Sequence, residues 1–512
     1  MSRRSKKVNP QLAALYNYKT TTDTENILEI RSDTLDPLTS NASKFVFRLE
    51  PTGFLDENSL LTFKLQTTNA ASENCRVNCW NGALGAIQRC ELTVGDFVLN
   101  DSDNVADWAT LETMGTVNRA QQNSVLSHYL GNQFYTQSVV TPSTENTGNT
   151  TVITVGEIYP DPDKCGIALG GYLDGASAQG GAHSARGDRT LALINSHRLL
   201  SDVTNNPTYA VPLGMIIPAL KGRTVPLFMF SEYRIYITVY FNTADKYVNN
   251  ITDTNYAGTG KLAAAPGDVS VQNVKLQIDY LIYPSVVQEK LMSQLQTAQG
   301  YTMDFYDVVH IMKQLPAGAN NQEQSVEFRI GQNDREVHSV YMMRRLNTRG
   351  GRQCSMLLEQ RVDGMPLESI QWNVNGADEY PEFKDNFASH YDEVSECLNT
   401  DLDVERPMFF CDINAEWAQL AGATNPLLGT YKPLAIDLRN GNPGIIGAGR
   451  KIGNYPIICK YKRRPHQAAV VGANNPILND VTGAMTVDFY AKCSRRAVIT
   501  AGTKGNNVVV SY

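Results

Sequence analysis

The sequence lacks the features that would mark a membrane-spanning protein or a familiar enzyme. It has no apolar run of the roughly 18 to 20 residues needed to cross a bilayer, and its basic start is not followed by a hydrophobic signal core. It has no G-x-S-x-G motif, no phosphate-binding P-loop and no glycine-rich dinucleotide motif between a strand and a helix. We therefore expect a non-enzymatic chain that is made in a reducing cytosol or nucleus.

Metal ligands are scarce and scattered. The seven histidines show no H-x-H or H-E-x-x-H spacing, and the nearest cysteine group, Cys75, Cys79 and Cys90, has no histidine close to it in sequence. The nine cysteines are odd in number and lie mostly among apolar strand residues, which favours buried side chains over a disulfide framework. We expect no metal, no cofactor and no small-molecule substrate.

The chain also lacks a positive net charge. Its 45 basic and 52 acidic residues give a net charge of −7, which argues against a surface that coats phosphate backbones. Basic residues gather only locally, most clearly at Arg3, Arg4, Lys6 and Lys7. Two interpretations of this arm stay open, a solvated terminus and a local contact with a polyanion.

What the sequence has in abundance is short strand patterns. Segments such as "KFVFRLE", "YRIYITVYF" and "AMTVDFYAKC" alternate apolar and polar residues, and helical patterns do not alternate regularly with them. This favours an all-β, mostly antiparallel fold over a parallel α/β sheet. At 512 residues the chain exceeds the size of one hydrophobic core, so two domains are expected.

The stretch "GALGAIQRCELTVGDFVL", residues 82–99, predicts a strand, a tight Gly-Asp turn and a second strand. Strict alternation puts Gln88, Cys90, Leu92 and Val94 on one, mostly apolar face. The opposite face, which begins with Ile87, is then largely polar. Such a strand suits one wall of a sandwich.

Two segments have helical periodicity. In "DNVADWATLETMGTVNRA" the apolar residues recur every three positions, which predicts an amphipathic helix over a sheet edge. In the second segment Pro284 stands at the start of the helix, Val287, Leu291 and Leu295 repeat at intervals of four, and Gly300 ends the run. We interpret this second helix as the bridge between two domains.

The two halves of the chain resemble each other weakly. "CELTVGDFVLNDSDN" is answered by "SIQWNVNGADEYPEFKDN", and "VQNVKLQIDYLIYPSVV" by "VTGAMTVDFYAKCSRRAVI", in the same order. This suggests one β-fold used twice. We expect the following segments: a basic arm at 1–26, a first domain at 27–283, a bridging helix at 284–300, a second domain at 301–496 and a C-terminal tail at 497–512.

The segment from about 131 to 210 is long and rich in small residues. Loops of this length are usually functional surface elaborations, so we expect it to project from the first domain. It contains the triplet Arg186, Gly187 and Asp188, which a cell-adhesion receptor could reach on an exposed loop. A chance match of three residues is the alternative.

Several of these segments together resemble a known family. The hairpin "GALGAIQRCELTVGD", the strand pair "FRLEPTGFLDENSLLTFKL" and the Pro-Leu strands "VPLFMFSEYRIYITVYF" and "YKPLAIDL" resemble the double jelly-roll major capsid proteins of tailless icosahedral double-stranded DNA viruses. The length and the basic start are most similar to those of polinton-like viruses and virophages. The resemblance implies two tandem eight-stranded antiparallel jelly rolls with a few short helices and long loops.

The resemblance also implies a function. Three chains would form a homotrimer with a pseudo-hexagonal outline, and trimers would tile the capsid of a virion together with penton and minor capsid proteins. Assembly would take place in the host cytoplasm or nucleus. The basic arm would face inward, toward genome DNA or an internal membrane.

Two other functions remain open from the sequence. A carbohydrate-binding or glycan-cleaving β-sandwich would use carboxylate pairs such as Asp161 with Asp163, and exposed aromatic clusters, although the chain has only four tryptophans. A minor vertex or penton capsid protein is the other alternative. Vertex proteins are usually single jelly rolls, so the internal similarity favours the major capsid protein.

Overall fold

The structure is a computed structural model. Outside the residues that it describes lie the predicted basic arm, with Arg3, Arg4, Lys6 and Lys7, and the triplet Arg186, Gly187 and Asp188. The described residues are 29–41, 43–67, 75–77, 82–116, 127–130, 137–142, 153–158, 208–250, 267, 269–297, 299–319, 322–346, 358–361, 368–385, 387–398, 412–413, 428–431, 434–439, 448–463, 484–502 and 506–511.

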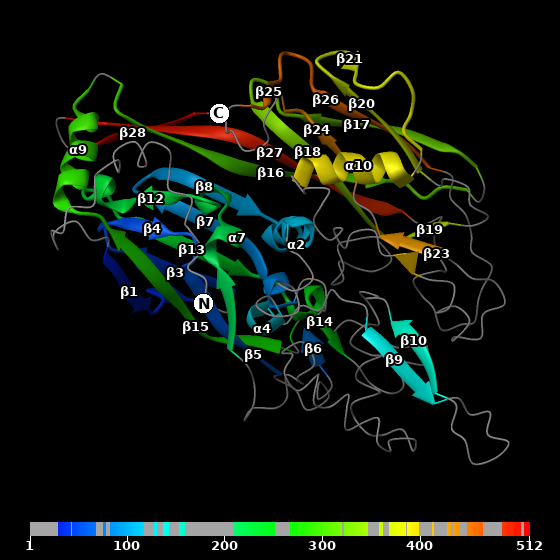
Figure 1. The fold of residues 1–512 in the computed structure, drawn as a ribbon, viewed down its shortest axis with the longest axis horizontal. Helices are drawn as coiled ribbons and strands as arrows, with labels where there is room; N and C mark the ends of the chain where they lie inside the picture. The colour runs from blue at the N-terminus through cyan, green and yellow to red at the C-terminus, as the bar shows by residue number, and fades with distance from the viewer. Residues whose placement is uncertain are drawn as a thin grey trace.

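The first half of the chain forms a sandwich of two antiparallel sheets (Figure 1). One sheet follows the order β11 (Thr208–Pro212), β5 (Leu60–Thr67), β15 (Val269–Ile282), β4 (Phe54–Asp56) and β12 (Thr224–Pro226), with β1 (Glu29–Leu35) also paired to β15. The other follows the order β2 (Thr39–Ser40), β3 (Lys44–Leu49), β13 (Ile235–Phe241), β7 (Ile87–Val94) and β8 (Phe97–Asp103).

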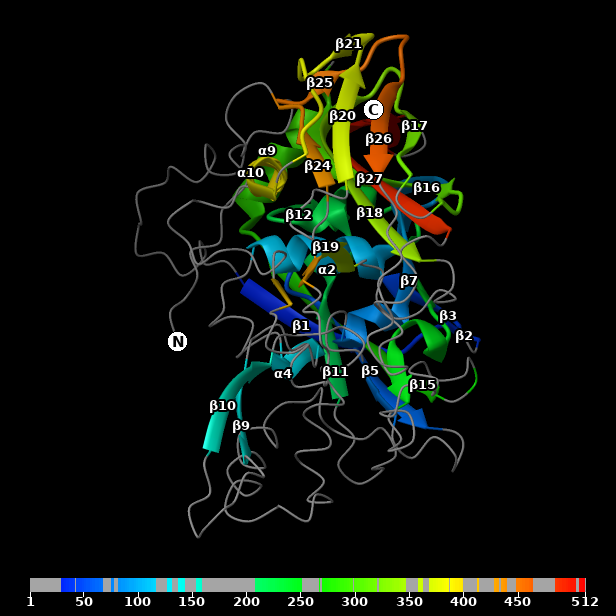
Figure 2. The ribbon, with the colours of Figure 1, turned by 90° about the vertical axis from the view of Figure 1, so that its right-hand side faces the viewer.

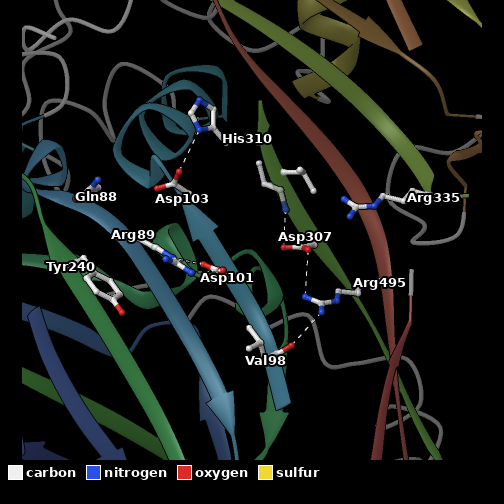
Figure 3. A pocket seen from close by; sticks show the side chains of 12 residues that line it. Gln88, Arg89, Val98, Asp101, Asp103, Tyr240, Asp307, His310, Arg335 and Arg495 are labelled. Atoms are coloured by element: carbon white, nitrogen blue, oxygen red, sulfur yellow. Dashed lines mark hydrogen bonds and ion pairs between the residues drawn. The ribbon is translucent and has the colours of Figure 1, made fainter. Parts of the chain in front are cut away.

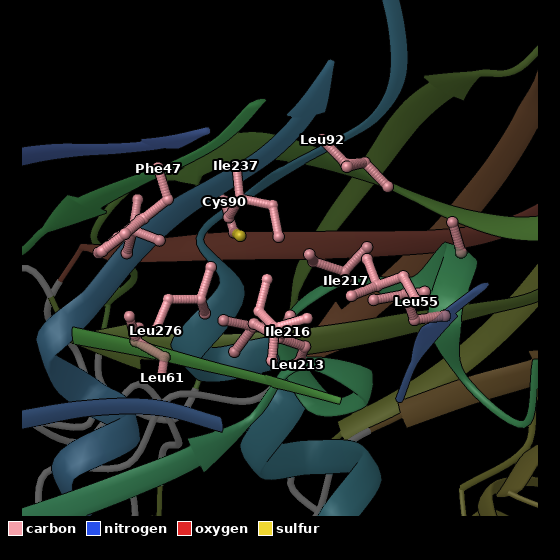
Figure 4. Packing of buried hydrophobic residues seen from close by; sticks show 14 of the residues in the cluster. Phe47, Leu55, Leu61, Cys90, Leu92, Leu213, Ile216, Ile217, Ile237 and Leu276 are labelled. Carbon is pink, nitrogen blue, oxygen red and sulfur yellow. The ribbon is translucent and has the colours of Figure 1, made fainter. Parts of the chain in front are cut away.

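The core of this sandwich lies between the apolar faces of its two sheets. Figure 4 shows Phe47, Leu92 and Ile237 of one sheet pointing toward Leu61 and Leu276 of the other. All of these side chains are fully buried. Alternating strands with one apolar face pack in this way because each sheet must bury that face against a partner.

The second half forms another antiparallel sandwich. Its larger sheet follows the order β16 (Tyr301–Leu315), β27 (Met485–Thr500), β18 (Glu336–Leu346) and β24 (Leu434–Asp437), with β25 (Arg450–Lys451) paired to β18 and β28 (Asn507–Ser511) paired to β27. Its smaller sheet follows the order β17 (Gln324–Gly331), β26 (Ile457–Arg463), β20 (Glu368–Val374) and β21 (Ala377–Asp378).

The two sandwiches share one strand order. In each, the first strand pairs with a long closing strand, β1 with β15 and β16 with β27. The facing sheet runs β3-β13-β7-β8 in the first sandwich and β17-β26-β20-β21 in the second. This is the arrangement of a jelly roll, used twice, so the predicted fold class is confirmed. The predicted similarity between "CELTVGDFVL" and "SIQWNVNGAD" falls on β7-β8 and β20-β21, which hold equivalent places in the first and second roll.

Short helices cover the rolls and connect them. The α-helices are α2 (Val105–Thr116), α4 (Ser127–Leu130), α7 (Leu213–Ile216), α9 (Ser285–Leu295) and α10 (Phe387–Leu398). The 3₁₀ turns are η3 (Gly82–Ala86), η6 (Pro218–Leu220), η7 (Leu227–Phe230) and η8 (Ala244–Lys246). Among the described helices, none is long and apolar enough to cross a membrane.

The remaining strands form small separate sheets. They pair β6 (Cys75–Val77) with β14 (Val248–Asn250), β9 (Gln137–Pro142) with β10 (Ile153–Ile158), and β23 (Leu428–Tyr431) with both β19 (Leu358–Arg361) and β22 (Asp412–Ile413). In Figure 2 the hairpin β9-β10 lies at the opposite end of the molecule from β21. This hairpin belongs to the segment for which a projecting loop is predicted.

The predicted faces of β7 are wrong at its first two residues. Ile87 is buried and Gln88 is exposed, whereas the alternation from Arg89 to Val94 is as predicted. The reason is a β-bulge, because Tyr240 pairs with Arg89 but the next residue of β13 pairs with Ile87, which skips Gln88. The preceding residues 82–86 form η3 rather than a strand.

The C-terminal segment is not a tail. Residues 497–500 complete β27, and β28 folds back along them, with Ala497 opposite Val510 and Ile499 opposite Val508. Ala497, Ile499 and Val508 are buried in the hydrophobic cluster that also includes the core of the first roll. The β-branched residues 508–510 suit such a strand, so the end of the chain helps to join the two rolls.

Candidate functional site at the interface between the two rolls

Several buried charged side chains and aromatic rings among the described residues lie where the two rolls meet. We call this contact the inter-roll interface. The first roll contributes β8 and α2, and the second contributes β16, β18 and β27. In Figure 1, α2 lies between the sheets of the first roll and the strands β16 and β18 of the second. The interface has an apolar part at α9, an aromatic part at α2 and a charged part along β8.

The apolar part is the helix that was predicted as a bridge. Val287, Leu291 and Leu295 are all buried, and they belong to the same cluster as Phe305 of β16 and the core of the first roll. Their spacing of four places them on one face of α9 because the α-helix repeats every 3.6 residues. The helix therefore extends the core of the first roll to the beginning of β16 and the end of β27, whereas the core of the second roll is a separate cluster.

The start of α9 follows from the sequence as well, but the helix ends at Leu295 and not at the predicted Gly300, which lies in the turn before β16. Pro284 is the N-cap and has an extended backbone, so the helix cannot begin earlier. Gly300 has φ +64°, and a Cβ atom there would clash with the Ile499 carbonyl oxygen. Only glycine fits that position, because other residues would have both the strained backbone and the clash.

The aromatic part centres on Trp108 of α2, which is 2% exposed. Its ring meets Tyr341 of β18 at 5.3 Å and 63°, and Tyr490 of β27 at 6.1 Å and 34°. The neighbouring Asn104 donates from Nδ2 to the Tyr490 hydroxyl at 2.5 Å. The predicted helix is therefore present, but the prediction that it is amphipathic is wrong, because residues 105–113 are all buried, the polar ones included.

Glu112 of α2 binds a lysine from each roll. Its Oε1 lies 2.6 Å from Lys221 Nζ in the first roll and 3.4 Å from Lys492 Nζ of β27 in the second. Burial raises the pKa of Glu112, but the charges of the two lysines lower it by a larger amount. The pKa of Glu112 therefore lies below its ordinary value. Burial lowers the pKa of Lys492 despite the pairing. The Lys492 ammonium also lies 4.4 Å from the centre of the Tyr306 ring, which favours the cation.

Arg495 of β27 binds the outermost strand of the sheet in the first roll. Its guanidinium donates to the carbonyl oxygens of Leu99 at 3.2 Å and Val98 at 3.3 Å. β8 is the last strand in its sheet, and such edges carry backbone groups that need partners. Asp307 of β16 accepts from Asn100 of β8 at 3.0 Å. Asp307 also lies 3.5 Å from Arg495 (Figure 3).

A third charged contact involves His310 of β16. Its Nε2 lies 2.9 Å from Asp488 Oδ1 of β27, and its Nδ1 lies 3.6 Å from Asp103 Oδ2 of β8. The ring stacks on Tyr490 at 5.1 Å and 20°. A cavity of about 660 Å³ opens beside these residues, between β7 and β8 of the first roll and β16 and β27 of the second. Among the described residues, no group of three or more histidine, cysteine or acidic side chains could hold a metal ion.

The sequence located only part of this interface. It identified Val287, Leu291 and Leu295, which the structure brings together, whereas the other predicted site residues lie outside the described chain. It missed Glu112, Asp307, His310, Lys492 and Arg495. No local signal singled them out, because Asp488 and Lys492 follow the ordinary alternation of a strand, on the face opposite Val487. Cys90, Cys397, Cys459 and Cys493 are buried, as expected for packing residues.

Several solved structures have a similar fold over nearly the whole chain. A capsid model of the PBCV-1 virus matches 97% of this chain and 100% of that chain, with 10% identity and a TM-score of 0.51. The Faustovirus major capsid protein matches 94% of this chain and 92% of its own, with 9% identity and a TM-score of 0.50. A structure of the Sputnik virophage matches 98% and 92%, with 10% identity and a TM-score of 0.51.

No protein-family model matches the sequence, and no curated protein matches it. At 9–10% identity the structural matches establish the fold alone. They agree with the repeated strand order of the two sandwiches. The chain therefore has the double jelly-roll fold, with α9 between its two rolls.

Proposed function

We propose that this chain is the major capsid protein of a double-stranded DNA virus and works by self-assembly. The observation that carries the proposal is the double jelly-roll fold, which spans nearly the full length both of this chain and of the Faustovirus major capsid protein. The PBCV-1 capsid and the Sputnik virophage support it, because the similar structures there belong to virus particles. A structural role also agrees with the sequence, in which we found no catalytic motif.

The repeated fold suggests how the shell is built. Three chains around a threefold axis place six similar rolls in a ring, and such a pseudo-hexagonal trimer can tile a surface with other trimers. Penton and minor capsid proteins would fill the remaining positions. Tiling requires a fixed angle between the two rolls of each chain, and the inter-roll interface supplies apolar, aromatic and charged contacts that hold it.

Exposed apolar side chains support contacts between subunits. Ile30 is 54% exposed on β1, a strand with no buried residue, and Leu38 just after it is 63% exposed. In the second roll, Met312 and Val509 are also exposed, on β16 and β28. Burial of such side chains is favourable, and subunit contacts of a trimer would cover them.

The mass of the purified chain in solution tests this proposal. Size-exclusion chromatography with light scattering should give the mass of three chains. A monomer that persists at all protein and salt concentrations would contradict the proposal. A glycan array and a hydrolase screen on the same sample test the β-sandwich alternative, which predicts binding or cleavage where the capsid function predicts neither.

The basic arm is proposed to face the interior of the shell. Arg3, Arg4, Lys6 and Lys7 would bind genome DNA or an internal membrane there. Deleting residues 1–8 should leave trimers intact and impair closure of the shell or packaging. Replacing the four basic residues by glutamine keeps the length of the arm and should give the same defect. An unchanged yield of filled particles from both variants would remove this role.

A further inference from the structure

We propose that His310 is a pH switch that holds the two rolls together when it is protonated and loosens their contact in alkaline solution. The residue lies on β16 of the second roll, with one carboxylate partner in its own roll and one in the first. The switch belongs to the single chain, so it does not depend on the proposed function.

The first argument is the geometry of the two ring nitrogens. Nε2 faces Asp488 at 2.9 Å and Nδ1 faces Asp103 at 3.6 Å. A carboxylate only accepts hydrogen bonds, so both nitrogens must carry a proton to satisfy both partners, and that form is the cation. When one proton leaves, one nitrogen becomes an acceptor that faces an acceptor.

The second argument is the position of the residue in the fold. Asp488 lies on β27, which pairs with β16, so that contact stays within the second roll. Asp103 ends β8 of the first roll. Next to it Asn104 binds the hydroxyl of Tyr490, whose ring stacks on His310. Loss of the cation therefore weakens a contact across the inter-roll interface rather than one inside a sheet.

The other charged groups around the cavity have partners of their own. On β7, Arg89 pairs with Asp101 at 2.7 Å and with Glu91 at 2.8 Å. On β16, Asp307 is bound by Asn100 and lies close to Arg495 of β27. Arg335, before β18, donates to Gln332 at 3.0 Å. Arg89 adds a weaker attraction to Asp103, but among the described residues no cation other than His310 lies within ion-pair distance of that carboxylate.

The acid-base behaviour agrees with this geometry. Burial lowers the pKa of His310, but the close contacts with the carboxylates of Asp103 and Asp488 outweigh it and raise the pKa to about 9. A raised pKa in the folded state means that the stabilisation is complete below pH 6.5 and is lost as the pH rises through about 9. At neutral pH His310 is therefore protonated and the two rolls are held together.

The experiment measures the protonation of His310 and the opening of the interface on the full chain. Side-chain NMR of histidine-labelled protein should show one resonance that titrates near pH 9 and disappears in His310→Gln. In Asp103→Asn the same resonance should titrate at lower pH. Asp103 has 58% of its side-chain surface exposed, so this second variant should fold even if the first does not.

Hydrogen exchange of β8, corrected for intrinsic rates, reports the opening itself. Between pH 7 and pH 10 the exchange rate of β8 should rise roughly ten-fold in the wild type. A ten-fold change corresponds to a pKa shift of about one unit, and we expect no more because only the Asp103 contact crosses the interface. Asp103→Asn should exchange faster at pH 7 and change little with pH. Asp378→Asn is the control, since Asp378 pairs with Lys460 inside the second roll at 2.7 Å.

Two results would overturn the switch. One is a His310 resonance that titrates near the ordinary value of a histidine. The other is the same rise of β8 exchange with pH in Asp103→Asn as in the wild type.

Discussion

Truncation of Trp108 to alanine should destabilise the protein and separate the unfolding of its two rolls. The side chain is buried, and removal of a buried tryptophan costs about 3–5 kcal/mol of unfolding free energy. Each aromatic pair contributes about 0.5–1.5 kcal/mol beyond burial, so the contacts with Tyr341 and Tyr490 supply about 1–3 kcal/mol between the rolls. A single cooperative transition should then divide into two.

Urea unfolding followed by circular dichroism, with calorimetry beside it, measures both effects. Trp372→Ala is the matched control, because Trp372 is fully buried within the second roll and its ring lies 6.4 Å from Phe489 of the same roll. It should destabilise the second roll without removing a contact between rolls. A double-mutant cycle with Tyr341→Ala separates a contact between the rolls from a general loss of packing. Trp108 should couple to Tyr341 by about 0.5–1.5 kcal/mol.

A coupling energy indistinguishable from zero would contradict the role of Trp108 between the rolls. A decrease of less than about 1 kcal/mol in the free energy of unfolding of Trp108→Ala would contradict it as well, because removal of a buried ring in contact with two tyrosines should cost more. Equal coupling of Trp372 and Trp108 to Tyr341 would show that the effect is a general loss of packing and not a contact between rolls.

Two further substitutions test the charged and apolar parts of the inter-roll interface. Glu112→Gln leaves Lys492 without its carboxylate, so urea unfolding should show that the free energy of unfolding falls by about 3–5 kcal/mol. Glu91→Gln, beside the more exposed Arg89, should lower it by less than about 1 kcal/mol. Equal losses in the two variants would contradict the role of the buried pair. Leu291→Ala should cost about 2–5 kcal/mol and Met292→Ala, which is 40% exposed on the same helix, less than about 1 kcal/mol. Serine at Val287, Leu291 and Leu295 together should give soluble protein that assembles incorrectly, and normal trimers would contradict the bridging role of α9.

Local patterns in the sequence predict much of this fold. Alternating strands, the Gly-Asp turn after β7 and the four-residue repeat of α9 each depend on neighbouring residues, so they can be recognised without the rest of the chain. The stripe Val287, Leu291 and Leu295 was found in this way, and the structure buries it.

The contacts between the rolls depend on residues far apart in the chain. Asn104 and Tyr490, which form a hydrogen bond, are separated by 386 positions. The helical period of α2 shows that Trp108 lies on an apolar face, but not which strands cover that face. The bulge at Gln88 is likewise set by pairing with β13, and alternation along β7 alone cannot reveal it. The strand β28 could have been found, because three valines in a row favour a strand over a tail.

Imaging of the purified chain by electron microscopy tests the central claim most directly. Class averages should show a particle of three chains with threefold symmetry and six similar lobes in a pseudo-hexagonal outline, one lobe for each jelly roll. Particles of one chain, or rings whose lobes do not come in pairs, would contradict the account.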